Sequence, residues 1–202
     1  MLKLSILDQS PVRSGVTPGE ALRETMELAE LADRLGYDRY WIAEHHNTPG
    51  LASASPEILI GQIAARTKHI RVGSGGVMLT HYAPLKVAEQ FRMLETLFPG
   101  RIDLGVGRAP GSDTKTARAL AGSIPQPGLE HYPEMLMDLY GFLADDLPPQ
   151  HPYHGIRATP AGPTIPELWL LGSSGASGMD AAAVGWSFCF AHFITPEGGE
   201  QV

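Results

Sequence analysis

The sequence predicts an α/β fold in which parallel strands alternate with helices, as in an α/β barrel or a doubly wound sheet. Two observations indicate this class. Short apolar segments alternate along the chain with segments of helical periodicity, and most of the connections between them are short. Polar residues collect at the carboxyl ends of the apolar segments, which is where parallel α/β folds bind their ligands.

The first strand and the first helix are predicted from their boundaries. Residues 2–7 are mostly apolar and end at a polar turn, so we expect a short strand there. Thr17 then reads as a helix N-cap, with Pro18 at the first helical position and Glu20 at the third. Apolar residues recur at helical spacing after it, and Gly36 marks the stop.

The next two elements follow the same logic. Residues 38–43 form an apolar run that we expect to be the second strand. A loop leads to Ser55, a candidate N-cap, and Pro56 at the first helical position opens a helix that is expected to reach about residue 67.

The third strand, expected over residues 70–79, contains two adjacent glycines. Gly75 and Gly76 weaken a strand unless a bulge is needed or a backbone or ligand approaches closely. A helix over residues 84–97 and a fourth strand over residues 101–106 continue the alternation.

The rest of the chain resumes the pattern after an interruption. Its expected elements are a helix over 112–120, a loop over 121–131, a helix over 132–144, a strand over 167–171, a helix over 176–184 and a strand over 186–191. The stretch 145–164 is rich in proline and glycine and is long for a connection, so we interpret it as a functional lid or a poorly ordered segment.

Composition excludes several function classes. The 202 residues are enough for a single domain spanning 1–202, and 43% of them are hydrophobic. A formal net charge of −7 without a Lys/Arg run argues against nucleic-acid binding. The single cysteine, Cys189, excludes an internal disulfide framework. With no signal peptide and no apolar run of membrane-spanning length, we expect no membrane association and a cytoplasmic location.

The chemistry is expected to centre on His45, which follows the second strand between Glu44 and His46. Alternate residues of a strand face the same way, so Glu44 and His46 would share one face and His45 the other. A neutral imidazole there suits acid/base work or hydrogen bonding to a cofactor ring, although a hydrogen-bonded structural role is the alternative. His81 and His192 are weaker candidates.

A second candidate site combines Arg108 with the turn that opens the last helix. Ser173, Ser174 and Ser177 offer hydroxyls and backbone N–H groups at a helix N-terminus, and the guanidinium of Arg108 suits phosphate. The alternative is that the serines only cap the helix and that Arg108 pairs with an acidic neighbour. The histidine spacing disfavours a metal-assisted hydrolase, and no metal site is predicted.

Several segments resemble the flavin-dependent luciferase-like monooxygenases, a family that includes the bacterial luciferase subunits. They are LSILDQSPV, YWIAEHHNTPGLASASPEILIGQIAARTKHIRVGSGGVML, PLKVAEQFRMLETLFPGRIDLGVGRAPGSD, ELWLLGSSGAS and FCFAHF. The resemblance implies a TIM-barrel-like (β/α)₈ fold, of which the sequence accounts for about six of the eight strands. The barrel is therefore expected to be incomplete on its C-terminal side.

The resemblance also implies a cofactor and roles for individual residues. Reduced FMN would lie across the carboxyl-terminal face, with the deazaflavin F420 as the alternative cofactor. By position, His45 matches the catalytic histidine that assists or protects a flavin peroxide intermediate, and Arg108 matches the arginine that grips the FMN phosphate. Ser173, Ser174 and Ser177 complete that phosphate site by position, and Gly75–Gly76 matches a non-prolyl cis peptide under the flavin ring.

The implied activity is an FMN-dependent monooxygenase that uses O₂ to oxidise a small organic substrate. A separate flavin reductase would supply the reduced cofactor, and a homodimer is expected. Because strands are missing from the pattern, a non-catalytic or vestigial flavin-binding protein is the alternative.

Overall fold

Each apolar segment of the sequence forms a parallel strand, and each segment of helical periodicity forms a helix. The computed structural model describes residues 2–109, 112–122, 129–197 and 199. The strands are β1 Ser5–Asp8, β2 Arg39–Ile42, β3 Arg71–Met78, β4 Ile102–Gly107, β5 Glu167–Gly172 and β6 Ser187–Phe190. The helices are α1 Pro18–Arg34, α2 Pro56–Arg66, η1 Leu79–His81, α3 Pro84–Leu97, α4 Thr114–Ala121, η2 Leu129–His131, α5 Tyr132–Ala144 and α6 Gly175–Val184.

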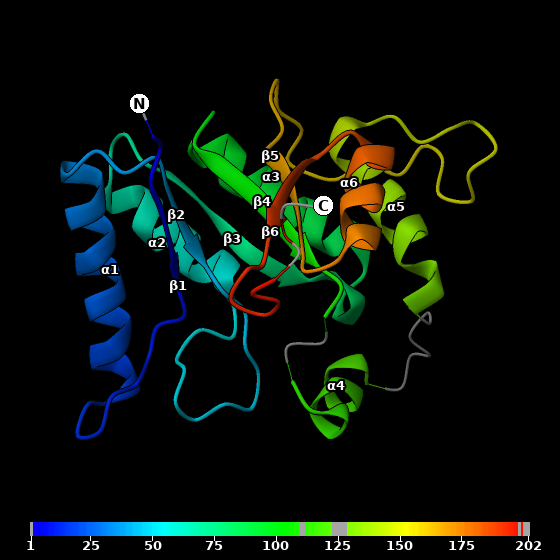
Figure 1. Ribbon diagram of the computed structural model, residues 1–202. Coiled ribbons are helices and arrows are strands. Elements are labelled where there is room, and N and C mark those ends of the chain that lie inside the picture. The colour runs from blue at the N-terminus through cyan, green and yellow to red at the C-terminus, as the bar shows by residue number, and fades with distance from the viewer. Residues whose placement is uncertain (1, 110–111, 123–128, 198, 200–202) are drawn as a thin grey trace.

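The strands form one parallel sheet in the order β1-β2-β3-β4-β5-β6. Figure 1 shows this sheet curled into an open barrel, with helices along its outer side. The predicted α/β barrel with about six strands is therefore confirmed. In the described ranges β1 and β6 each pair with a single strand, so both edges of the sheet are open. No helix of the described residues combines the length and the apolar character that a membrane span requires.

The expected elements all form, with boundaries shifted by a few residues. The helices predicted over 84–97 and 132–144 are reproduced without change as α3 and α5. Thr17 caps α1 through a capping box with Glu20, as predicted. Ser55 is the N-cap residue of α2, as predicted, but its side chain makes no cap hydrogen bond. Part of the loop expected over 121–131 lies outside the described residues.

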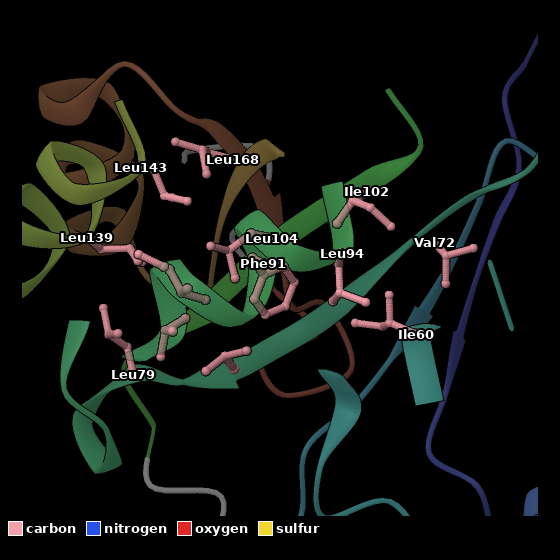
Figure 2. Packing of buried hydrophobic residues seen from close by; sticks show 14 of the residues in the cluster. Ile60, Val72, Leu79, Phe91, Leu94, Ile102, Leu104, Leu139, Leu143 and Leu168 are labelled. Carbon is pink, nitrogen blue, oxygen red and sulfur yellow. The ribbon is translucent and has the colours of Figure 1, made fainter. Parts of the chain in front are cut away.

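The hydrophobic core lies between the outer face of the sheet and the helices. Figure 2 shows Phe91 and Leu94 of α3 beside Ile102 and Leu104 of β4, and Leu139 is among the α5 side chains on the same core. This is the packing that alternation in the strands and 3.6-residue periodicity in the helices predict.

The inner face of the sheet is polar at the amino end of the strands. Asp103, on β4, is fully buried, and its carboxylate accepts hydrogen bonds from Arg39 Nη1 at 2.7 Å, Trp41 Nε1 at 2.8 Å and Arg71 Nε at 2.7 Å. Glu167 of β5 pairs with the same two arginines. Removing one member would leave buried charge unpaired, which costs about 3–5 kcal/mol. This network occupies the amino end of the inner face and leaves the carboxyl end for ligands.

The stretch 145–164 is neither a lid over the site nor a poorly ordered segment, which were the two interpretations of its composition. Leu147 and Ala158 are buried in the core, and Arg92 of α3 donates hydrogen bonds to the carbonyls of Leu143 and Gly162. The segment is therefore docked on the outer side of the barrel. None of its residues lines the cavity described next.

Candidate functional site

A cavity of about 380 Å³ opens at the carboxyl ends of the six strands. Its volume falls within the range of about 300–1,000 Å³ that is usual for small-molecule sites. All seven site residues predicted from the sequence line it, and these are His45, Gly75, Gly76, Arg108, Ser173, Ser174 and Ser177. Residues that lie up to 132 positions apart in the sequence thus meet in one site because parallel strands end on the same side.

His45 follows β2 and is held through its backbone, which leaves its ring available. Its N–H donates to the carbonyl of Ser53 at 3.0 Å. Its ring Nδ1 is buried and has no hydrogen-bond partner among the described residues. Burial lowers the pKa of His45; Glu44 acts in the opposite direction, and His46 lowers it further. The site therefore favours a neutral imidazole with an unpaired ring nitrogen, which suits hydrogen bonding to a ligand.

Glu44 and His46 lie together, as strand alternation predicted, but Glu44 lines the same cavity as His45. His46 Nε2 lies 2.7 Å from Glu44 Oε1, and Tyr82 Oη donates to the same oxygen at 2.7 Å. The backbone N–H of Met78 donates to Glu44 Oε2 at 3.0 Å. Glu44 is thus a buried carboxylate whose two oxygens both have hydrogen-bond partners, and no role of its own was predicted for it.

Gly75 and Gly76 form the floor of the cavity where β3 passes between β2 and β4. The peptide bond between them is cis, as the family resemblance implied. A Cβ atom at position 75 would lie 2.6 Å from Leu7 Cδ1, and one at position 76 would lie 2.9 Å from the Gly105 carbonyl oxygen. The register with β4 also shifts between Gly75 and Val77. The two glycines are therefore required by close contacts, which is one of the explanations that the sequence left open.

The part of the cavity lining formed by Arg108 and the start of α6 carries the hydrogen-bond donors expected of an anion site. Ser174 is the N-cap of α6, and its hydroxyl accepts from the N–H of Ser177 at 3.4 Å. The capping role considered for the serines thus exists for Ser174. Arg108 is exposed at the end of β4 and makes no ion pair with a carboxylate of the described residues. Its guanidinium and the α6 N-terminus line the same cavity, which is the arrangement that binds phosphate.

Several cavity residues were not singled out from the sequence. They are Leu7, Gln9, Ala43, Met78, Leu171, Ala191, Phe193 and Ile194. Phe193 and Ile194 are 70% and 60% exposed, so they present apolar surface at the site. Most of these residues are ordinary apolar side chains, and only the barrel geometry shows which of them reach the cavity. By contrast, His81 and His192, the weaker candidates, do not line it.

The described residues contain no group of three or more His, Cys, Asp or Glu side chains arranged to hold a metal ion. The polar groups that line the cavity are one guanidinium, three serine hydroxyls, one imidazole, the amide of Gln9 and the carboxylate of Glu44.

The comparison with known families agrees with this geometry. A family model described as "Luciferase-like monooxygenase" matches residues 2–201. The chain belongs to this family. Among its relatives, the uncharacterized protein YceB of Bacillus subtilis is 54% identical over all of this chain and 60% of the relative. The N-acetyl-S-alkylcysteine monooxygenase of the same organism is 47% identical over 98% of this chain and 59% of the relative.

Several solved structures share the fold. Apo-MsnO8 superimposes with a TM-score of 0.89 at 46% identity, over 98% of this chain and 57% of that one. The oxygenating constituent of 3,6-diketocamphane monooxygenase in complex with FMN has a TM-score of 0.72 at 19% identity, over 93% of this chain and 57% of that one. An F420-dependent secondary alcohol dehydrogenase has a TM-score of 0.66 at 17% identity, over 87% of this chain and 53% of that one. The chain spans about 60% of the length of the curated relatives it matches.

Proposed function

We propose that this chain binds reduced FMN in the cavity and uses O₂ to oxidise a small organic substrate. The proposal rests on one observation: groups suited to a phosphate and an imidazole suited to a ring line the same cavity. Arg108 and the serines of the α6 N-terminus offer charge and donors at one wall, and His45 offers an unpaired ring nitrogen at another. An FMN molecule carries both a phosphate and a hydrogen-bonding ring, so the donor set fits it.

Each residue has a separate task in this proposal. Arg108 pairs with the phosphate, and the backbone N–H groups and hydroxyls at Ser173, Ser174 and Ser177 complete the grip. The backbone at Gly75 and Gly76 lines the cavity, and the flavin ring would lie beside it. Reduced flavin, when bound, supplies the electrons for the reaction of O₂ with the substrate. His45, held neutral by burial, accepts or donates a proton at Nδ1.

The substrate side of the cavity is apolar. Met78, Phe193 and Ile194 line the cavity, and two of them expose most of their surface. A 47% identical relative is named an N-acetyl-S-alkylcysteine monooxygenase. We therefore propose N-acetyl-S-alkylcysteines, which carry an apolar S-alkyl group, as the first substrates to test.

Three further parts of the proposal come from the family. A separate flavin reductase supplies reduced FMN, the protein forms a homodimer, and it acts in the cytoplasm. F420 is the alternative cofactor, since a distant structural neighbour uses it. Titration with each cofactor in parallel distinguishes the two.

The second candidate function is flavin binding without catalysis. It is favoured by the open edges of the six-stranded sheet, which leave the barrel without a closing strand in the described residues.

One experiment separates these candidates. The purified protein is titrated with FMN while the visible spectrum is recorded, and reduced FMN is then mixed with ¹⁸O₂ and N-acetyl-S-methylcysteine. We expect a bound-flavin spectrum and a product that carries ¹⁸O. Binding without an oxygenated product would favour the second candidate, and absence of binding would contradict both.

A further inference from the structure

Outside the seven predicted site residues, the cluster around Glu44 is the most completely built polar feature near the cavity. Glu44 is 1% exposed, and three groups from three different segments engage its two oxygens. They are His46 from the same strand end, Met78 N–H from the end of β3, and Tyr82 Oη from the residue after η1. Such a buried carboxylate is stable only when its charge is compensated by hydrogen bonds and partners.

The position of Glu44 in the sheet explains why these contacts matter. The hydrogen-bonded ladder between β2 and β3 ends at the pair Ile42 and Ser74. Beyond that pair β3 continues through Gly75 and Gly76, where its register with β4 also shifts. The bond from Met78 N–H to Glu44 Oε2 therefore joins the two strand ends across the stretch in which the ladder has stopped.

We propose that Glu44 is a positioning residue: its carboxylate clamps the end of β2 to the end of β3 and supplies a fixed negative charge beside His45. The clamp sets the placement of His45 relative to Gly75 and Gly76 across the cavity floor. This inference deepens the proposed function, since it assigns a task at the same site. It differs from a purely structural role because it predicts an electrostatic effect on His45.

The electrostatic effect on the pKa of His45 depends on the charged and titratable groups around it. Glu44 and His46 flank it on its own strand end, and Arg108, the residue after β4, is the other charged side chain among the described residues that line the cavity. Of the groups that shift the pKa of His45, Glu44 is the one that raises it, against burial and His46. Removal of the Glu44 charge therefore lowers the pKa of His45 further.

The test uses Glu44→Gln, Glu44→Asp and the matched control Glu57→Gln. Glu57 is a neighbouring carboxylate on α2 that hydrogen-bonds Gln90 and does not line the cavity. The titration of His45 is followed by NMR of the imidazole ¹⁵N–¹H signals in the flavin-free protein of residues 1–202, with assignment by the loss of one signal in His45→Gln. FMN affinity, kcat and KM are measured on the same proteins.

We expect Glu44→Gln to lower the titration midpoint of His45 and to reduce kcat roughly ten- to a hundredfold through misplacement of His45, with a much smaller change in FMN affinity. Glu44→Asp keeps the charge but shortens the reach, so its His45 midpoint returns toward wild type while kcat stays low. Glu57→Gln leaves the midpoint unchanged.

Two results would overturn the proposal. The first is a His45 midpoint in Glu44→Gln that equals wild type. The second is a wild-type kcat in Glu44→Asp, which remains decisive where Glu44→Gln fails to fold. Because the titration is made without flavin, its outcome is independent of whether FMN is the cofactor.

Discussion

His45 differs from the other histidines at strand ends in what surrounds its ring. Its Nδ1 is buried without a partner in the described part of the chain, whereas His46 is bound to Glu44. The two-residue alternation of a strand was enough to predict this separation from the sequence. The partners of Glu44 were not predictable in the same way, because Met78 and Tyr82 lie 34 and 38 positions further along the chain.

Replacement of His45 by alanine should separate binding from catalysis. We expect FMN affinity to change little, since the phosphate grip lies on another wall, and turnover to fall about 10²- to 10⁴-fold with the loss of an acid/base group. Fluorescence titration with FMN and steady-state kinetics measure the two effects. His192→Ala is the matched control, because that strand-end histidine does not line the cavity. Loss of FMN binding in His45→Ala would assign the residue to the cofactor grip or to folding.

Gly172 is predicted to be essential for the geometry of the phosphate wall. A Cβ atom there would lie 2.3 Å from Ser177 Cβ, so Gly172→Ala displaces Ser177 or strains β5. Overpacking of this kind costs about 1–3 kcal/mol, and we expect weaker FMN binding with it. Gly175→Ala is the control, since nothing lies within 4 Å of its Cβ position. Thermal unfolding and FMN titration of both variants test this, and equal behaviour would contradict it.

At the scale of elements, two helix starts that look alike in the sequence differ in structure. Thr17 and Ser55 both precede a proline and a glutamate, yet Thr17 alone makes the side-chain cap. Thr17→Ala should therefore lower the free energy of unfolding by about 0.5–2 kcal/mol. Ser55→Ala should lower it much less. Urea denaturation measures both, and an equal loss in the two variants would contradict the assignment.

Two features were not predicted from the sequence, namely η1 and the fixed position of the stretch 145–164, and both have the same physical cause. Leu79 was expected to end the third strand, but with Thr80 and His81 it forms η1 instead, and His81 does not line the cavity. The stretch 145–164 is rich in turn residues, but its fixed position comes from contacts with Arg92 and Glu95 of α3. Local patterns predict where an element begins and which face is apolar. They do not show which residues far along the chain will contact an element, and those contacts decide its final conformation and position.

At the scale of the whole molecule, the proposed homodimer needs an exposed apolar surface, and two adjacent helices carry exposed apolar residues. Ile58 of α2 is 65% exposed, and Met93 and Leu97 of α3 are 55% and 63% exposed. Apolar surface of this kind marks interfaces when it is contiguous. We expect a dimer in sedimentation equilibrium that Met93→Glu dissociates. Leu28→Glu, on α1, is the control, and a wild-type chain that stays monomeric at high concentration would contradict the expectation.

The proposed function requires that the cavity binds FMN with its phosphate at Arg108. The most direct measurement compares the affinity for FMN and for riboflavin, which lacks the phosphate, in the wild type, in Arg108→Ala and in the exposed control Arg23→Ala. Loss of a charged hydrogen bond costs about 1.5–3 kcal/mol, so Arg108→Ala should weaken FMN binding roughly ten- to a hundredfold and riboflavin binding little. Arg23→Ala should bind both ligands like the wild type. Equal losses for FMN and riboflavin in Arg108→Ala, or no FMN binding by the wild type, would contradict the account.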